Sequence, residues 1–157
     1  MPQLSKMRVT TRRLIVAEGV DEMIAGKAVL VVEDDGEIRD LYRFAFEAAG
    51  LKVWEVGTRA EAVAARQRPA CVILDWNLPD GNGLDVAQAL HRRWGATLPI
   101  ILVTGSDLGP QEIAATGAVC RFSKPFDLDE VVGTIEGTVG RRRRRATPAP
   151  SAPSPVH

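Results

Sequence analysis

The chain has 157 residues, of which 45% are apolar and 25% charged, and this composition is typical of one globular domain of ordinary size. No apolar stretch approaches the ~20 residues needed to cross a bilayer, and the first residues contain no apolar segment followed by a secretion cleavage site. We therefore expect a cytoplasmic protein without a membrane span. The formal net charge of zero is unevenly distributed, because residues 28–140 carry ten Lys and Arg against seventeen Asp and Glu while both ends are basic.

Residues 1–26 show no clean hydrophobic period, so we expect a poorly defined N-terminal extension there. From residue 27 onward, short apolar runs alternate with segments of helical period. Strands are predicted at 27–32, 52–56, 70–74, 99–103 and 118–122. Helices are predicted at 37–49, 58–67, 84–94, 110–116 and 127–139. In the first helix, the apolar face consists of Ile38, Leu41, Ala45 and Ala49.

Several helix ends carry local signals. Thr58 and Glu61 have the spacing of a capping box, and Asn82 and Asp127 stand where they can cap the helices that follow them. Three glycines between residues 133 and 140 each disfavour a helix interior by up to ~1 kcal/mol. We therefore expect the last helix to fray early.

The end of the chain differs in composition from the rest. Five consecutive arginines, Arg141–Arg145, are followed by a mixture of Ala, Thr, Pro and Ser. Such a segment has too few apolar residues to form a packed core, so residues 140–157 are predicted to be a disordered tail. Nucleic-acid binding by the arginine run is an alternative that we favour less than a solvated tail.

Five strands that alternate with five helices predict an α/β domain whose parallel sheet is covered on both faces. Right-handed crossovers restrict the possible topologies. We predict a doubly wound five-stranded sheet over residues 27–139 with the strand order 2-1-3-4-5. In this order the ends of the first and third strands lie side by side, at the switch point where ligands bind.

Polar side chains follow four of these strands, at the point where each strand ends. They are Glu33, Asp34 and Asp35 after the first strand, Asp75 after the third, Thr104 after the fourth and Lys124 after the fifth. Carboxyl ends of parallel strands meet at one edge of a sheet, so we expect these groups to converge, with Asp35 facing solvent. Carboxylates, a hydroxyl and an ammonium suit a hard divalent cation and a phosphoryl group.

Four motifs make residues 27–139 resemble the receiver domain of bacterial two-component response regulators, similar to the chemotaxis regulator and with a flavodoxin-like fold. The motifs are Val-Val-Glu-Asp-Asp at 31–35, Leu-Asp-Trp-Asn-Leu-Pro-Asp-Gly-Asn-Gly at 74–83, Leu-Val-Thr-Gly at 102–105 and Ser-Lys-Pro-Phe at 123–126. The resemblance implies that Asp75 is the phosphoacceptor and that Thr104 and Lys124 contact phosphoryl oxygens. It also implies a cis peptide bond between Lys124 and Pro125.

The same resemblance implies a cofactor, partners and an output. Mg²⁺, for which Mn²⁺ can substitute, is expected to bind Glu33, Asp34, Asp75 and the backbone carbonyl of Asn77. A histidine kinase or a histidine phosphotransfer protein would supply the phosphoryl group from phosphohistidine. We expect a stand-alone, phosphorylation-controlled signalling domain whose changed surface binds an unidentified downstream protein. It would be a phosphoprotein, with autophosphatase activity at most, rather than a turnover enzyme.

One position departs from the family pattern and keeps alternatives open. Arg121 stands three residues before Lys124, where the family usually has an aromatic switch residue, and strand alternation directs the neighbouring Phe122 to the opposite face. Arg121 either exchanges partners such as Glu112 or is a solvent-exposed strand residue. The first alternative function is therefore a constitutive interaction module that has lost switching. The second is a phosphohydrolase that forms an aspartyl-phosphate, although Asn77 stands where such enzymes usually have an acid/base Asp.

Overall fold

The computed structural model describes residues 28–146, with side chains described through residue 140. The expected extension at residues 1–26 and the tail from residue 147 onward lie outside the described residues. The strands are β1 (Ala28–Val32), β2 (Lys52–Val56), β3 (Cys71–Asp75), β4 (Asn77–Leu78), β5 (Gly81–Asn82), β6 (Ile100–Thr104) and β7 (Cys120–Ser123). The helices are α2 (Gly36–Ala48), α3 (Arg59–Val63), α4 (Gly83–Trp94), α5 (Pro110–Ala115) and α6 (Leu128–Ala146).

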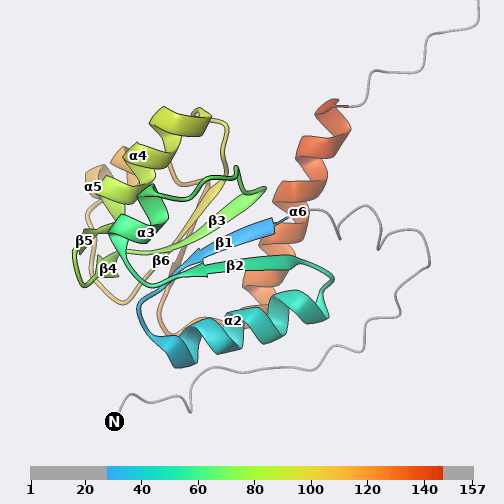
Figure 1. The fold of residues 1–157 in the computed structure, drawn as a ribbon, viewed down its shortest axis with the longest axis horizontal. Helices are drawn as coiled ribbons and strands as arrows, with labels where there is room; N and C mark the ends of the chain where they lie inside the picture. The colour runs from blue at the N-terminus through green and yellow to red at the C-terminus, as the bar shows by residue number, and fades with distance from the viewer. Residues whose placement is uncertain (1–27, 147–157) are drawn as a thin grey trace, which may run out of the picture.

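The main sheet is parallel, with the order β2-β1-β3-β6-β7, and it confirms the predicted doubly wound fold. Helices α2 and α6 cover one face, and α3, α4 and α5 lie on the other (Figure 1). Val32 of β1 pairs with Leu74 of β3, so the residues that follow these two strands emerge side by side. The small antiparallel hairpin β4–β5, which the sequence did not predict, follows β3 directly.

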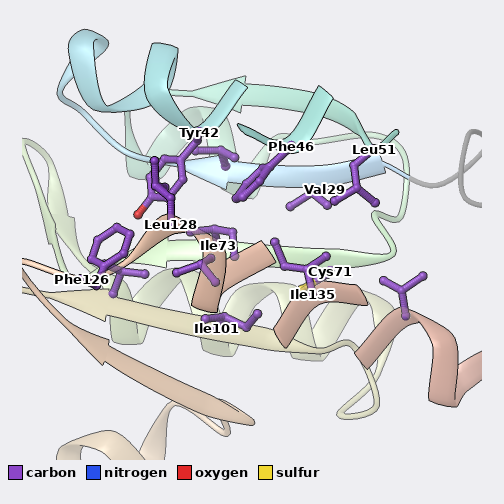
Figure 2. Packing of buried hydrophobic residues seen from close by; sticks show 14 residues of the cluster. Val29, Tyr42, Phe46, Leu51, Cys71, Ile73, Ile101, Phe126, Leu128 and Ile135 are labelled. Carbon is purple, nitrogen blue, oxygen red and sulfur yellow. The ribbon is translucent and has the colours of Figure 1, made fainter. Parts of the chain in front are cut away.

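Each central strand supplies both faces of the sheet with apolar side chains. Val29 and Val31 belong to a cluster with α2 and α6, whereas Leu30 and Val32 belong to a second cluster with α3 and α4. Figure 2 shows the first cluster. All five residues of β1 are buried, which explains the continuous apolar run. Full burial of a large aliphatic side chain stabilises the fold by about 1.5–3 kcal/mol.

Local capping signals set the helix starts as predicted. Thr58 Oγ1 accepts a hydrogen bond from the Glu61 amide, and Asn82 Oδ1 accepts one from Asp85. The Glu61 carboxylate bonds to the Gly57 amide instead of the Thr58 amide, so the reciprocal half of the expected box is displaced by one residue. Asp35, which we expected to face solvent, is half-buried and caps α2.

Two predicted boundaries were wrong. Helix α3 ends at Val63, although the prediction extended to residue 67, because Ala62 is its only buried residue and Pro69 disfavours helical backbone just before it. Strand β7 starts at Cys120 rather than at residue 118. Val119 is 60% exposed, and Gly117, with φ of 64°, forms the turn before it.

The last helix is longer than predicted. Helix α6 runs to Ala146, so the expected fraying was wrong and residues 140–146 are helical rather than part of a disordered tail. The glycines lie on the exposed side, while Val131, Ile135 and Val139 are buried on the other. Burial of this stripe outweighs the glycine penalty, and arginine itself has a high helix propensity. Within residues 28–146, no helix has the length and apolar character required for a membrane span.

Candidate functional site

The acidic loop that follows β1 presents Glu33 and Asp34 in different environments. Glu33 extends the strand, because its amide donates to the Val56 carbonyl over 3.1 Å. Alternation places the Glu33 side chain on the sheet face of Val29 and Val31, and only 2% of the residue is exposed. Asp34 is exposed. One carboxylate therefore lies inside the site and the other borders solvent.

Arg39 fixes the backbone of this loop. Its Nη1 atom donates to the Glu33 carbonyl over 2.7 Å and to the Asp34 carbonyl over 3.1 Å. This role was not predicted from the sequence. The available signal was spacing, because Arg39 lies four residues after the helix cap Asp35, so one turn of α2 brings its side chain back towards the loop.

Asp75 ends β3 and is 4% exposed. Its Oδ1 accepts a hydrogen bond from the Asn77 amide over 3.1 Å, and its Oδ2 accepts one from Lys124 over 3.0 Å. The start of α4 comes close to the end of β3, because a Cβ on Gly83 would lie 3.1 Å from both the Asp75 carbonyl oxygen and the Trp76 Cα. A side chain at residue 83 would therefore require the backbone around Asp75 to shift by a few tenths of an ångström.

Lys124 follows β7 and connects this strand to Glu33 after β1 and to Asp75 at the end of β3. Its amide donates to the Thr104 carbonyl over 2.8 Å, and its Nζ lies 3.1 Å from Glu33 Oε2 and 3.0 Å from Asp75 Oδ2. Partial burial alone would lower the pKa of Lys124, but attraction by Asp75 and Glu33 outweighs it and raises the pKa above its ordinary value. The Lys124–Pro125 peptide bond is cis, as the resemblance implied.

The structure brings three of the predicted metal ligands together. Glu33, Asp34 and Asp75 each place a carboxylate oxygen within 4.8 Å of the other two. Hard carboxylate oxygens are the ligands that Mg²⁺ prefers, so this donor set fits the ion. Burial raises the pKa of Glu33 to about 8, with the nearby Asp75 charge adding to the effect and Lys124 opposing it. A bound cation would favour the deprotonated form.

Thr104 and Asn77 are joined through a residue that the sequence analysis did not single out. Thr104 is 1% exposed, and its Oγ1 accepts a hydrogen bond from the Ser106 amide over 2.9 Å. The Thr104 O–H therefore keeps its own proton to donate. Asn77 Nδ2 donates to Ser106 Oγ over 2.8 Å and connects the loops that follow β3 and β6.

Arg121 and Phe122 lie on opposite faces of β7, as predicted. Phe122 packs in the α2–α6 cluster at 6.3 Å from the Phe126 ring. Arg121 is exposed, and its Nη2 donates to Ser123 Oγ over 2.9 Å. Among the described residues it forms no ion pair with Glu112, so the structure favours the solvent-exposed alternative.

The side chains that helix α2 buries most fully differ from the predicted apolar face. Tyr42 and Phe46 are its fully buried residues, while Ile38, Leu41 and Ala45 pack only partly against the cluster. The four-residue spacing of the two aromatic residues was the available signal. Tyr42 therefore lies in the same cluster as Val31 and Ile73, which are on the same sheet face as Glu33 and Asp75 by strand alternation.

The chain is similar in sequence to known proteins. The protein-family model of the response regulator receiver domain matches residues 29–136. The chain is similar to the KDP operon transcriptional regulatory protein KdpE of Escherichia coli (strain K12), with 39% identity over 126 residues that cover 78% of this chain and 54% of KdpE. It is also similar to the probable transcriptional regulatory protein TcrX of Mycobacterium tuberculosis, with 38% identity over 117 residues, 72% of this chain and 50% of TcrX. The chain spans about half the length of these curated relatives.

Solved structures show the same fold. The response regulator protein TrrA of Thermotoga maritima, described as a complex with Mg²⁺-BeF, has a TM-score of 0.65 at 25% identity and covers 71% of this chain and 98% of TrrA. The receiver domain of the sensor histidine kinase PA1611 of Pseudomonas aeruginosa, described with a magnesium ion in its active site cleft, has a TM-score of 0.66 at 24% identity. It covers 73% of this chain and 98% of the PA1611 domain.

Proposed function

The chain belongs to the response regulator receiver domain family, and from this premise we propose that it accepts a phosphoryl group on Asp75 and thereby changes a protein-interaction surface. One observation carries the proposal. Three carboxylate oxygens gather within 4.8 Å, and the Lys124 ammonium bonds to two of these carboxylates. Such a cluster of like charges is unfavourable unless cations neutralise it. It therefore suits chemistry in which a cation and a phosphoryl group arrive together.

Glu33, Asp34, Asp75 and the backbone carbonyl of Asn77 would hold Mg²⁺, with Mn²⁺ as a substitute. When bound, the ion neutralises charge on the carboxylates and on the phosphoryl oxygens. The similar TrrA protein, described as a complex with Mg²⁺-BeF, supports this part of the proposal. Arg39 supports it too, because it fixes the carbonyls of the two residues that supply the loop carboxylates.

Asp75, Lys124 and Thr104 have separate roles in the phosphoryl transfer. An Asp75 oxygen forms a bond to phosphorus while the P–N bond of phosphohistidine breaks and the imidazole leaves. The Lys124 ammonium moves from the carboxylates to a phosphoryl oxygen, and the Thr104 hydroxyl donates to another. Phosphoryl transfer of this kind depends on positioning and charge stabilisation, with little further chemistry for the protein to do. The chain is accordingly a phosphoacceptor, with autophosphatase activity at most.

A histidine kinase or a histidine phosphotransfer protein would be the phosphoryl donor, and the downstream target would be another protein surface. A cytoplasmic location is part of the proposal. KdpE and TcrX are named as transcriptional regulators and are about twice as long as the matched region. The stand-alone arrangement expected from the sequence stays a prediction, as does the minor possibility of nucleic-acid binding through Arg141–Arg145.

A constitutive interaction module is the second candidate. The observation that favours it is Arg121, which is exposed and bonds to Ser123 at the position where an aromatic switch residue was expected. This candidate predicts partner binding that does not depend on phosphorylation. The phosphohydrolase alternative has less support, because Asn77 offers an amide that already donates to Ser106.

Intact-mass analysis with a small phosphodonor tests the proposal. Wild type, Asp75→Asn and the control Asp107→Asn, which alters an exposed aspartate outside the carboxylate cluster, are each incubated with acetyl phosphate and Mg²⁺ or with EDTA. We expect one added phosphoryl group in wild type and Asp107→Asn, and none in Asp75→Asn or in EDTA. If wild type gains no phosphoryl group, the receiver function is wrong and the constitutive module is preferred.

A further inference from the structure

The hydroxyl of Tyr42 is buried without a partner beside the proposed phosphorylation site. Tyr42 is 1% exposed, and no hydrogen-bond partner is found for its Oη atom in the described part of the chain. A buried hydroxyl that makes no hydrogen bond destabilises a fold. Tyrosine usually satisfies its hydroxyl when the ring is buried, so this exception calls for a physical explanation.

The ring of Tyr42 is held firmly at the site end of the core. It lies 5.4 Å from the Phe46 ring and stacks on Phe126 at 5.9 Å with an interplanar angle of 12°. In Figure 2 the Tyr42 oxygen lies at the Phe126 end of the cluster, away from Leu51. Phe126 follows Lys124 by two residues, so this is the end at which the carboxylates lie.

Alternation along the strands places the hydroxyl on the same face as the buried acids. Val29 and Val31 of β1 share a cluster with Tyr42. Glu33 comes two residues after Val31, so its side chain points to the same face of the sheet. Asp75 likewise comes two residues after Ile73 in β3, so its side chain points to the same face as those of Cys71 and Ile73. Burial raises the pKa of Tyr42, and the charges of Glu33 and then Asp75 raise it further, so both carboxylates lie within electrostatic reach.

We propose that Tyr42 is a positioning residue whose hydroxyl donates a hydrogen bond to the Glu33 carboxylate when the Lys124 ammonium leaves for the phosphoryl group. The inference rests on the proposed function, which moves the ammonium. In the present structure the Lys124 ammonium donates hydrogen bonds to both Glu33 and Asp75. Its departure removes a charged donor from a carboxylate that is only 2% exposed.

Apart from the bound cation, Glu33 would then keep one partner in the protein, the Asp35 amide, which donates to its Oε1 over 3.2 Å. A buried carboxylate with a missing donor is unfavourable. The Tyr42 O–H has an unused proton on the same face, so it supplies the replacement. The hydroxyl is thus unsatisfied in the unphosphorylated protein and satisfied in the phosphorylated one, which stabilises the second state relative to the first.

The variant Tyr42→Phe removes this one oxygen and leaves the ring in place. Phe46→Leu is the matched control, because it alters the same aromatic cluster without touching the hydroxyl. Full-length proteins are unfolded with urea in EDTA and are titrated with beryllofluoride, a phosphoryl mimic, at saturating Mg²⁺. Since Tyr42 is the only tyrosine in the chain, protein labelled with ring-¹³C tyrosine also reports the hydroxyl environment directly by NMR.

We expect Tyr42→Phe to keep or raise the urea midpoint in EDTA while its affinity for beryllofluoride falls about 3- to 10-fold, the size of one hydrogen bond. Phe46→Leu should lower the urea midpoint and keep the affinity. The tyrosine resonance of wild type should shift when beryllofluoride is added.

An unchanged affinity in Tyr42→Phe, an unmoved tyrosine resonance or a lower urea midpoint in EDTA would each overturn the inference alone, because wild type would still bind the mimic. A wild-type protein that binds no beryllofluoride overturns the proposed function, and the inference with it.

Discussion

Replacing Lys124 with methionine tests the charge balance of the site. The substitution keeps most of the aliphatic stem but removes the ammonium that lies 3.0 Å from Asp75 Oδ2 and 3.1 Å from Glu33 Oε2. Removing one partner of a buried ion pair destabilises a protein by about 3–5 kcal/mol, because the remaining charge stays buried and unpaired. The Lys124 side chain is 23% exposed, so water screens part of the interaction. We therefore expect a loss of about 2–3 kcal/mol.

The loss should depend on pH through Glu33. The pKa of Glu33 rises from 4.5 to about 8 in the folded protein, so between these values the folded state binds more protons than the unfolded state. This contribution to stability is present below pH 4.5 and is lost as the pH rises through 8. Without the ammonium the pKa of Glu33 rises further. The deficit of Lys124→Met should therefore be smallest near pH ~6 and grow towards pH ~9.

Urea unfolding in EDTA, followed by circular dichroism at several pH values, measures these effects. The control is Lys52→Met, which removes an exposed lysine at the start of β2 and should change stability by no more than about 0.5 kcal/mol. Added Mg²⁺ should restore part of the loss in Lys124→Met, since a cation again neutralises the carboxylates. If Lys124→Met and Lys52→Met have equal stabilities, the ammonium does not neutralise the buried acids.

Three further predictions concern the metal site and the core. Mg²⁺ affinity should rise with pH up to about 8, because the proton held by Glu33 through its raised pKa must leave; calorimetric titration that gives a flat profile would contradict this. Arg39→Gln should weaken Mg²⁺ binding about 10-fold by freeing the loop carbonyls, whereas the exposed control Arg92→Gln should not. Phe46→Ala should lower the free energy of unfolding by about 3–5 kcal/mol, and Phe44→Ala, at a site 63% exposed, by less than about 0.5 kcal/mol; similar losses would disprove the assigned packing.

Features that depend on short stretches of chain were predictable. The buried strands β1, β3 and β6 are continuous apolar runs. Asn82 caps α4 by accepting a hydrogen bond from the amide of Asp85, only three residues away. Regular alternation of strands and helices then restricts the sheet order to few choices. The boundaries of α3, β7 and α6 were less predictable, because they depend on which side chains find a surface to pack against.

Contacts between distant residues were beyond prediction from local pattern. Tyr42 belongs to an ordinary amphipathic helix in sequence, and only the packing of α2 against the sheet places its ring in the cluster that contains Val31 of β1 and Ile73 of β3. The Asn77–Ser106 bond likewise joins residues 29 positions apart. Neither polar side chain carries a sequence signal for its partner.

The residues at the ends of the strands can be read from the amino-acid order alone, because apolar runs and the turn residues after them are local properties of the chain. The position of the Lys124 ammonium between two carboxylates, one 91 and the other 49 residues away in sequence, depends instead on the folded arrangement of the sheet. The register of β1, β3, β6 and β7 fixes those atoms within hydrogen-bond distance, and register arises from packing of the whole sheet against its helices.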